Sequence, residues 1–199
     1  MIERIVSFGA SGDLTSRLLM PAVAQLAEAG LLPAGCSIVG CASTDRSVED
    51  FREHIAVALK EHAAVSANCR DDVVRRLSFQ PADVRSAADV RRVIGEDRPD
   101  TLVYLALPPF LLHSALQALA TAGLRTSDAL AIEKPFGTDL ASARELNEIL
   151  RVQMPEPTIF RVDHFLSSEF IHRVIALRFL NRVFEPIWNA VHVERVDIS

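Results

Sequence analysis

Short apolar runs alternate with segments of helical periodicity along most of this chain, and this alternation restricts the fold more than any other feature. Runs suited to buried strands lie at residues 4–8, 37–42, 77–79, 102–107, 129–133 and 158–162. Segments with helical spacing of apolar residues lie at 13–29, 47–61, 110–122 and 140–150, and further surface helix is expected within 70–98. Strands and helices that alternate in this way build a parallel sheet with helices on both faces. We therefore predict an α/β fold with a doubly wound, mostly parallel sheet of the Rossmann type.

Two local patterns specify helix ends and faces within this scheme. Residues 47–50 (SVED) resemble a capping box, so Ser47 is expected to open the helix that follows. In the helix that follows the strand at 129–133, apolar residues recur at helical spacing and predict one buried stripe. The stripe consists of Leu140, Ala143, Leu146 and Leu150.

The pattern changes near residue 165. A helix is expected from about 169 to 184, and residues 191–198 alternate strictly between apolar and polar side chains. Such alternation predicts a strand with one face in water, unlike the continuous apolar strands before it. We therefore predict a first domain over residues 1–165 and, over residues 166–199, the incomplete beginning of a second, α+β domain.

Composition and charge exclude several classes of partner. The formal net charge is −5 and no stretch concentrates Lys and Arg, so we expect no nucleic-acid partner. Residues 101–124 carry no charge, but Pro108 and Pro109 divide the stretch, so we expect no membrane span. The N-terminus does not resemble a signal peptide. The three cysteines have no metal-ligand spacing, which favours a reduced, cytoplasmic protein without a metal site.

A glycine turn follows the first predicted strand. Gly9 allows a tight turn, and Gly12 allows the close approach of a pyrophosphate to the start of the next helix. The spacing is G-x-x-G, which also occurs in glycine turns that bind nothing. The position, at the opening of an α/β pattern, favours a dinucleotide site. The candidate cofactor-binding residues of this turn are Gly9, Ala10, Ser11, Gly12, Asp13 and Leu14.

The end of the second strand normally selects between NAD and NADP. An acidic residue there binds the adenine ribose hydroxyl of NAD, whereas a basic residue accommodates the 2′-phosphate of NADP. Ser43, Thr44 and Arg46 are suited to bind a phosphate, and Asp45 would repel it. These residues leave both cofactors open.

Two more motifs follow predicted strands and so lie at the edge where ligands bind in open α/β sheets. Lys134 is a compact cation suited to a substrate hydroxyl or a cofactor, and Pro135 restricts its backbone and permits a cis bond. Asp163 and His164 follow the last strand, and as neighbours on an extended segment they are expected to face opposite ways.

Several of these segments together resemble the glucose-6-phosphate dehydrogenase family in order and spacing, over essentially the whole chain. The matching segments are 8–14 (FGASGDL), 104–109 (YLALPP), 133–137 (EKPFG), 161–164 (RVDH), 177–181 (LRFLN) and 188–189 (WN).

The resemblance implies oxidation of the C1 hydroxyl of glucose 6-phosphate to a lactone, a step of the pentose phosphate pathway, with hydride transfer to NADP or NAD. It assigns the glycine turn to the cofactor pyrophosphate. It assigns Lys134 to substrate and nicotinamide, Asp163 to the orientation of a catalytic histidine, and His164 to the substrate phosphate. It further implies that residues 166–199 begin a substrate and dimerisation domain, so a homo-oligomer is expected.

The sequence also departs from the family pattern. Phe165 and Ser168 replace a tyrosine and a lysine that contact the sugar phosphate in the family, although Ser168 keeps its place as a candidate substrate-binding residue. Ser43 replaces an arginine that is often found after the second strand. The catalytic histidine of the family belongs to the second domain, so we expect the 199 residues to bind nucleotide without completing the active site. A dehydrogenase of a different or unphosphorylated sugar and a non-catalytic nucleotide-binding paralogue are the alternatives.

Overall fold

The structure is a computed structural model that describes residues 2–164 and 169–197. It consists of two compact units, Met1–Arg161 and Val162–Ser199. The first unit contains the sheet and most of the helices, whereas the second contains one helix and irregular chain.

Six parallel strands form one sheet in the first unit, in the order β3-β2-β1-β4-β5-β6. The strands are β1 (Arg4–Phe8), β2 (Ser37–Ala42), β3 (Leu77–Pro81), β4 (Thr101–Leu105), β5 (Ala129–Glu133) and β6 (Ile159–Val162). The central strand β1 pairs with both β2 and β4, so that Val6 lies opposite Val39 on one side and Val103 on the other. The chain adds strands on one side of β1 and then crosses to the other side. This confirms the predicted doubly wound α/β fold.

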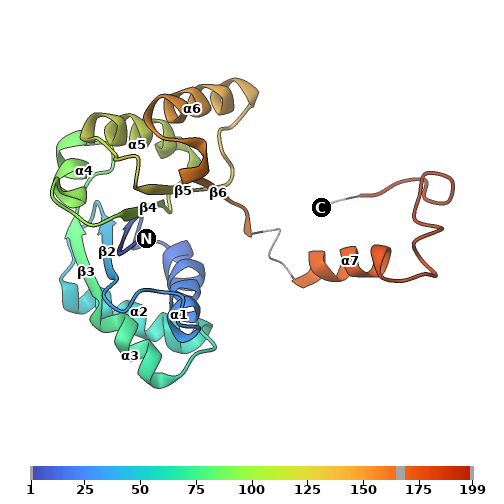
Figure 1. Cartoon of the computed structure of the whole chain (residues 1–199), viewed down its shortest axis with the longest axis horizontal. Coiled ribbons are helices and arrows are strands. Elements are labelled where there is room, and N and C mark those ends of the chain that lie inside the picture. The colour runs from blue at the N-terminus through green and yellow to red at the C-terminus, as the bar shows by residue number, and fades with distance from the viewer. Residues whose placement is uncertain (1, 165–168, 198–199) are drawn as a thin grey trace. The chain divides into compact units, whose positions relative to one another are not determined.

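Helices cover both faces of the sheet (Figure 1). One face carries α1 (Met20–Glu28), α2 (Val48–His62) and α3 (Ala67–Arg75), and the other carries α4 (Ala87–Ile94), α5 (Pro109–Ala122) and α6 (Leu140–Gln153). Alternate strand residues such as Val6 and Phe8 pack in one buried cluster with apolar residues of α4, α5 and α6. Burial of strands on both faces explains why their sequences are continuously apolar.

Serine and aspartate side chains begin most of these helices where the sequence changes from loop to helix. The Ser47 hydroxyl accepts a hydrogen bond from the Asp50 backbone amide at 3.0 Å, which confirms Ser47 as the N-cap residue of α2. Ser66 and Ser86 act in the same way for α3 and α4. Asp139 and Ser142 form a reciprocal capping box at α6, so α6 starts at a defined residue directly after the loop that follows β5.

The first helix differs from the regular helix predicted over 13–29. A π-helical turn, Thr15–Leu19, precedes α1. The Thr15 hydroxyl donates to the Gly9 carbonyl at 3.2 Å, and the Ser16 hydroxyl donates to the Asp13 carbonyl at 3.1 Å. Side chains that bond to nearby carbonyls compete with the regular backbone pattern, which accounts for the wider turn.

Three other predictions were wrong in detail. Leu146 and Leu150 of the predicted stripe are buried, but Leu140 is 66% exposed because it is the first residue of α6, beyond the sheet it was expected to cover. In the second unit, α7 (Glu169–Phe179) ends before residue 184. Residues 191–197 form no strand. A strand needs a partner to hydrogen-bond with, and every strand of the described residues belongs to the six-stranded sheet.

The second unit has no buried core among its described residues. No residue of α7 is buried, and large apolar side chains are exposed along α7 and the segment after it. Among the described residues, the structure contains no helix whose length and apolar character would let it span a membrane.

A buried ion pair joins the loops at the amino ends of β4 and β5. Asp128 is fully buried and accepts hydrogen bonds from the Arg98 guanidinium at 2.6 Å, the Thr101 amide at 3.1 Å and the Arg125 amide at 2.8 Å. Burial by itself raises the pKa of Asp128, but these hydrogen bonds to the ionised form outweigh it and lower the pKa. The charged carboxylate is therefore part of the folded state.

We expect Asp128→Asn to lower the free energy of unfolding by about 3–5 kcal/mol, because it leaves the buried Arg98 without its counter-charge. Urea unfolding at neutral pH measures the change. Glu148→Gln, which removes an exposed pair with Arg151, is the control and is expected to unfold like the wild type.

The pH dependence of this stabilisation follows from the lowered pKa. The stabilisation is complete above the ordinary aspartate pKa of about 4 and is lost as the pH falls through the lower pKa of folded Asp128. The free energy of unfolding of Asp128→Asn should therefore lack this part of its fall at acid pH. An equal acid response in both proteins would contradict the assignment.

Candidate functional site

The turn after β1 contacts the ends of both neighbouring strands. Gly9 has a φ of +87°, and a Cβ at this position would lie 2.0 Å from the Ala106 carbonyl oxygen. The Gly9 and Ala10 amides both donate to the Cys41 carbonyl at 2.9 Å, and the Ala106 amide donates to the Phe8 carbonyl at 2.9 Å. Only glycine fits at position 9, since any side chain would collide with backbone that is itself hydrogen-bonded.

These contacts determine which amides of the turn can meet a ligand. The Gly9, Ala10 and Gly12 amides donate within the protein, the last to the Gly9 carbonyl at 3.0 Å. Among the described residues, no hydrogen bond is donated by the amides of Ser11, Asp13 or Leu14. Unpaired N–H groups at the start of a helix form a binding site for an anion.

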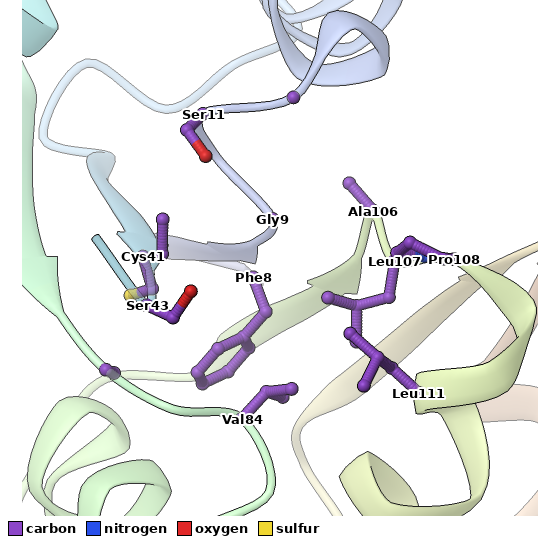
Figure 2. A pocket seen from close by; sticks show the side chains of 13 residues that line it. Phe8, Gly9, Ser11, Cys41, Ser43, Val84, Ala106, Leu107, Pro108 and Leu111 are labelled. Carbon is purple, nitrogen blue, oxygen red and sulfur yellow. The ribbon is translucent and has the colours of Figure 1, made fainter.

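A cavity of about 220 Å³ opens beside this turn and is here called the switch-point cavity. It lies where β1 and β4 separate, at the carboxyl ends of the strands (Figure 2). The lining residues are Phe8, Gly9, Ser11, Gly12, Cys41, Ala42, Ser43, Ala82, Val84, Ala106, Leu107, Pro108 and Leu111. In open α/β sheets this crevice is the place where ligands bind.

The wall of the switch-point cavity is largely apolar and was partly missed by sequence reasoning. Figure 2 shows the glycine turn and Ser43 on one side, and the segment Ala106–Pro108 with Leu111 on the other. Burial raises the pKa of the Cys41 thiol to about 12, so Cys41 contributes a neutral surface. Apolar residues at strand ends look like core in a sequence, and only their position directly after β3 and β4 could have indicated a ligand-binding role.

The residues after β2 lie in two places. Ser43 is exposed and lines the switch-point cavity. Arg46 is half-buried and lines a separate hollow with Asp50, Glu53 and His54. Its Nη1 atom is buried and has no hydrogen-bond partner among the described residues. A buried guanidinium nitrogen without an acceptor is suited to an anionic ligand.

The end of β5 combines a buried carboxyl group with an exposed lysine. Glu133 is 5% exposed and accepts a hydrogen bond from the hydroxyl of Tyr104 on β4. Burial raises the pKa of Tyr104 above its ordinary value, and the hydrogen bond to Glu133 adds to this effect. Lys134 is exposed, and its bond to Pro135 is cis, as the sequence allowed.

The remaining predicted residues belong to the second unit or lie outside the described residues. Asp163 and His164 follow β6 and are half-buried within Val162–Ser199, which the structure describes as a separate unit. A shared pocket for Lys134 and Asp163 therefore stays a prediction. Ser168 and Phe165 lie outside the described residues.

The fold and the site define a class of protein. A glycine turn with unpaired amides opens a helix beside a cavity at the switch point of a parallel sheet, which is the arrangement of Rossmann-type dinucleotide-binding domains.

Comparison with known proteins identifies the family within this class. Residues 6–173 match the family described as glucose-6-phosphate dehydrogenase, NAD binding domain. The chain belongs to this family, as the resemblance of its motifs predicted.

Similar proteins are considerably longer than this chain. Glucose-6-phosphate 1-dehydrogenase 2 of Mycobacterium bovis is 37% identical over 98% of this chain and 41% of its own length. Glucose-6-phosphate 1-dehydrogenase of Treponema pallidum is 34% identical with the same coverage. The crystal structure of glucose-6-phosphate 1-dehydrogenase from Mycobacterium avium superimposes with a TM-score of 0.74 at 31% identity, over 96% of this chain and 42% of that one. The chain thus spans about 41% of the length of the curated relatives it matches.

Two glycine substitutions should separate the structural and binding roles of the turn. The nearest atom to a Cβ on Gly12 is the Gly9 carbonyl oxygen at 3.2 Å, so Gly12→Val is expected to fold and to lower the affinity for a nicotinamide cofactor at least about tenfold. Gly9→Ala is expected to lower the melting temperature as well, because of the clash with Ala106. Calorimetric titration and thermal unfolding measure the two effects. Unchanged cofactor affinity in Gly12→Val would contradict the assignment of the turn.

Proposed function

We propose that this chain is the cofactor-binding part of a glucose-6-phosphate dehydrogenase that oxidises the C1 hydroxyl of glucose 6-phosphate to the lactone. The observation that carries the proposal is the switch-point cavity beside three unpaired amides, in a chain of this family. A solved glucose-6-phosphate dehydrogenase in complex with glucose 6-phosphate is similar to this chain, with a TM-score of 0.74 at 31% identity. The reduced state of all three cysteines is in keeping with a cytoplasmic enzyme of the pentose phosphate pathway.

The residues of the turn fit the pyrophosphate of a nicotinamide dinucleotide. The amides of Ser11, Asp13 and Leu14 would donate to its oxygens, and the start of the helix adds a favourable dipole. When bound, the cofactor supplies the acceptor for the hydride from C1. The apolar wall formed by residues such as Leu107 and Leu111 would keep water from the bound cofactor.

Lys134, Asp163, His164 and Ser168 are proposed to serve the sugar. Lys134 would donate a hydrogen bond to the substrate and hold it beside the nicotinamide. Asp163 would orient and stabilise the histidine that takes the C1 hydroxyl proton, a base that we do not assign within these 199 residues. His164 and Ser168 would contact the substrate phosphate. Residues 166–199 would begin the substrate domain, through which we expect the whole protein to form a homo-oligomer.

We propose NADP as the preferred cofactor, with NAD as the alternative. Among the described residues, the buried Nη1 of Arg46 has no acceptor, which supports a 2′-phosphate ligand. The exposed residues Ser43 and Thr44 carry hydroxyls that are suited to share it. Asp45 weakens this preference by charge repulsion.

The role of Lys134 is tested by steady-state kinetics of the whole protein that carries this chain. Lys134→Ala is expected to lower kcat for glucose 6-phosphate about a hundredfold or more, because it removes a donor to the reacting substrate. Lys60→Ala, at the other lysine of the sequence and exposed on α2, is the matched control. Wild-type turnover in Lys134→Ala would refute its role. A preference for free glucose over glucose 6-phosphate would favour the alternative of an unphosphorylated substrate, which Phe165 and Ser168 suggest.

The cofactor preference is tested at Arg46. Arg46→Gln is expected to weaken NADP binding about ten- to a hundredfold and to leave NAD binding unchanged, since a charge-assisted hydrogen bond contributes roughly 1.5–3 kcal/mol. Arg75→Gln, in an exposed pair with Asp72 on α3, is the control. Equal losses for the two cofactors in Arg46→Gln would show that Arg46 does not bind the 2′-phosphate.

A further inference from the structure

The loop after β5 is the segment that carries Lys134. It runs from Lys134 to the start of α6 at Leu140. Gly137 has a φ of +85°, and a Cβ there would lie 2.7 Å from the Ala143 amide nitrogen, so this end of the loop packs directly on α6. The residue before Gly137, Phe136, is half-buried and packs against the apolar cluster beneath α5 and α6.

One side chain from the neighbouring strand β6 contacts this loop from outside. The Arg161 guanidinium lies over the Phe136 ring, 5.4 Å from its centroid. Its Nη2 donates to Asn147 Oδ1 on α6 at 2.7 Å, and its Nη1 lies 2.6 Å from Glu156 Oε1, just before β6. Arg161 therefore connects the loop, the middle of α6 and the entry to β6 through one planar group.

These contacts use properties that lysine does not have. A guanidinium stacks on an aromatic face and donates from two nitrogens in a fixed plane, whereas an ammonium is a single, strongly hydrated centre. The Arg161 side chain is 31% exposed, but both of its hydrogen bonds lie at the surface and Glu156 is 70% exposed, so the stacking on the half-buried Phe136 ring is the better shielded of its contacts.

We propose that Arg161 is a positioning residue that holds the loop of Lys134 in place for catalysis. The inference rests on the function proposed above, because it takes Lys134 as the residue that contacts the sugar. Lys134 lies two residues before Phe136, so a shift of the Phe136 ring moves the backbone from which Lys134 extends. A displacement of about 1 Å at a reacting group is sufficient to slow a reaction by as much as a hundredfold.

Loss of the Arg161 contacts should affect kcat and cofactor affinity differently. The three partners of Arg161 described above, Phe136, Asn147 and Glu156, are not among the residues that line the switch-point cavity. Loss of its contacts should therefore lower kcat for glucose 6-phosphate and leave the affinity for the cofactor unchanged. A role in stability alone would lower the melting temperature and leave kcat per folded molecule intact.

The test compares Arg161→Lys, Phe136→Leu and the double variant in the whole protein that carries this chain. Arg161→Lys keeps the charge, and Phe136→Leu keeps an apolar side chain in the core but removes the aromatic face. Each is expected to lower kcat about ten- to a hundredfold. Because both disrupt the same contact, the double variant should lose little more than either one. Arg151→Lys is the matched control and should keep wild-type kcat. Arg151 forms an exposed pair with Glu148, and both residues lie on α6.

Amide hydrogen exchange supplies a readout that does not depend on turnover. Arg161→Lys should increase exchange in residues 134–139 and leave exchange in the glycine turn unchanged. Wild-type kcat and exchange in both single variants, or additive losses in the double variant, would overturn the proposal. If the wild type does not oxidise glucose 6-phosphate, the proposed function fails, and the exchange data still show whether Arg161 holds the loop.

Discussion

The backbone after β1 and the backbone after β4 approach each other so closely that no side chain fits between them at position 9. This approach exists because the two strands are neighbours in the sheet while their following helices lie on opposite faces. The chain must diverge at this point, and the divergence leaves the switch-point cavity. The Ser11 amide lines this cavity and has no partner among the described residues, whereas the amides on either side of it donate to the Cys41 and Gly9 carbonyls. One steric constraint thus produces both the shape and the polarity of the site.

The two edges of the sheet differ in the polar groups that they carry. At the amino edge, the buried carboxylate of Asp128 is satisfied by protein donors, and the Arg4 guanidinium donates to the Val93 and Ile94 carbonyls at the end of α4. At the carboxyl edge, donors such as the Leu14 amide and Arg46 Nη1 have no partner among the described residues. Polar groups that are paired within the chain contribute rigidity, whereas unpaired donors are available to an anionic ligand. The division is not complete, because Arg98 Nε and Arg125 Nε beside Asp128 are also buried without a partner among the described residues.

The glycine turn and the loop of Lys134 differ in how they are built. The turn that would hold the cofactor is fixed by backbone hydrogen bonds to strand ends, so its geometry depends little on side chains. The loop of Lys134 is fixed by side chains instead: the Tyr104 hydroxyl bonds Glu133 at its start, and Arg161 covers Phe136 further along. Side-chain contacts are more easily altered by substitution than backbone contacts, so a substitution is expected to change the loop of Lys134 more readily than the glycine turn.

The sequence by itself determined the class of fold, the strand positions to within one or two residues, the cap at Ser47 and the turn at Gly9, because periodicity, capping and glycine conformation are local properties. It also determined the family, since several ordered motifs are read without any structure. It could not determine that the amides of Gly9 and Ala10 are occupied, that Leu107 and Leu111 line a cavity, that Leu140 is exposed or that residues 191–197 form no strand. Each of these depends on which distant segment lies alongside. Only the tertiary structure decides that, because hydrogen-bond partners and burial are properties of pairs of segments and not of either segment alone.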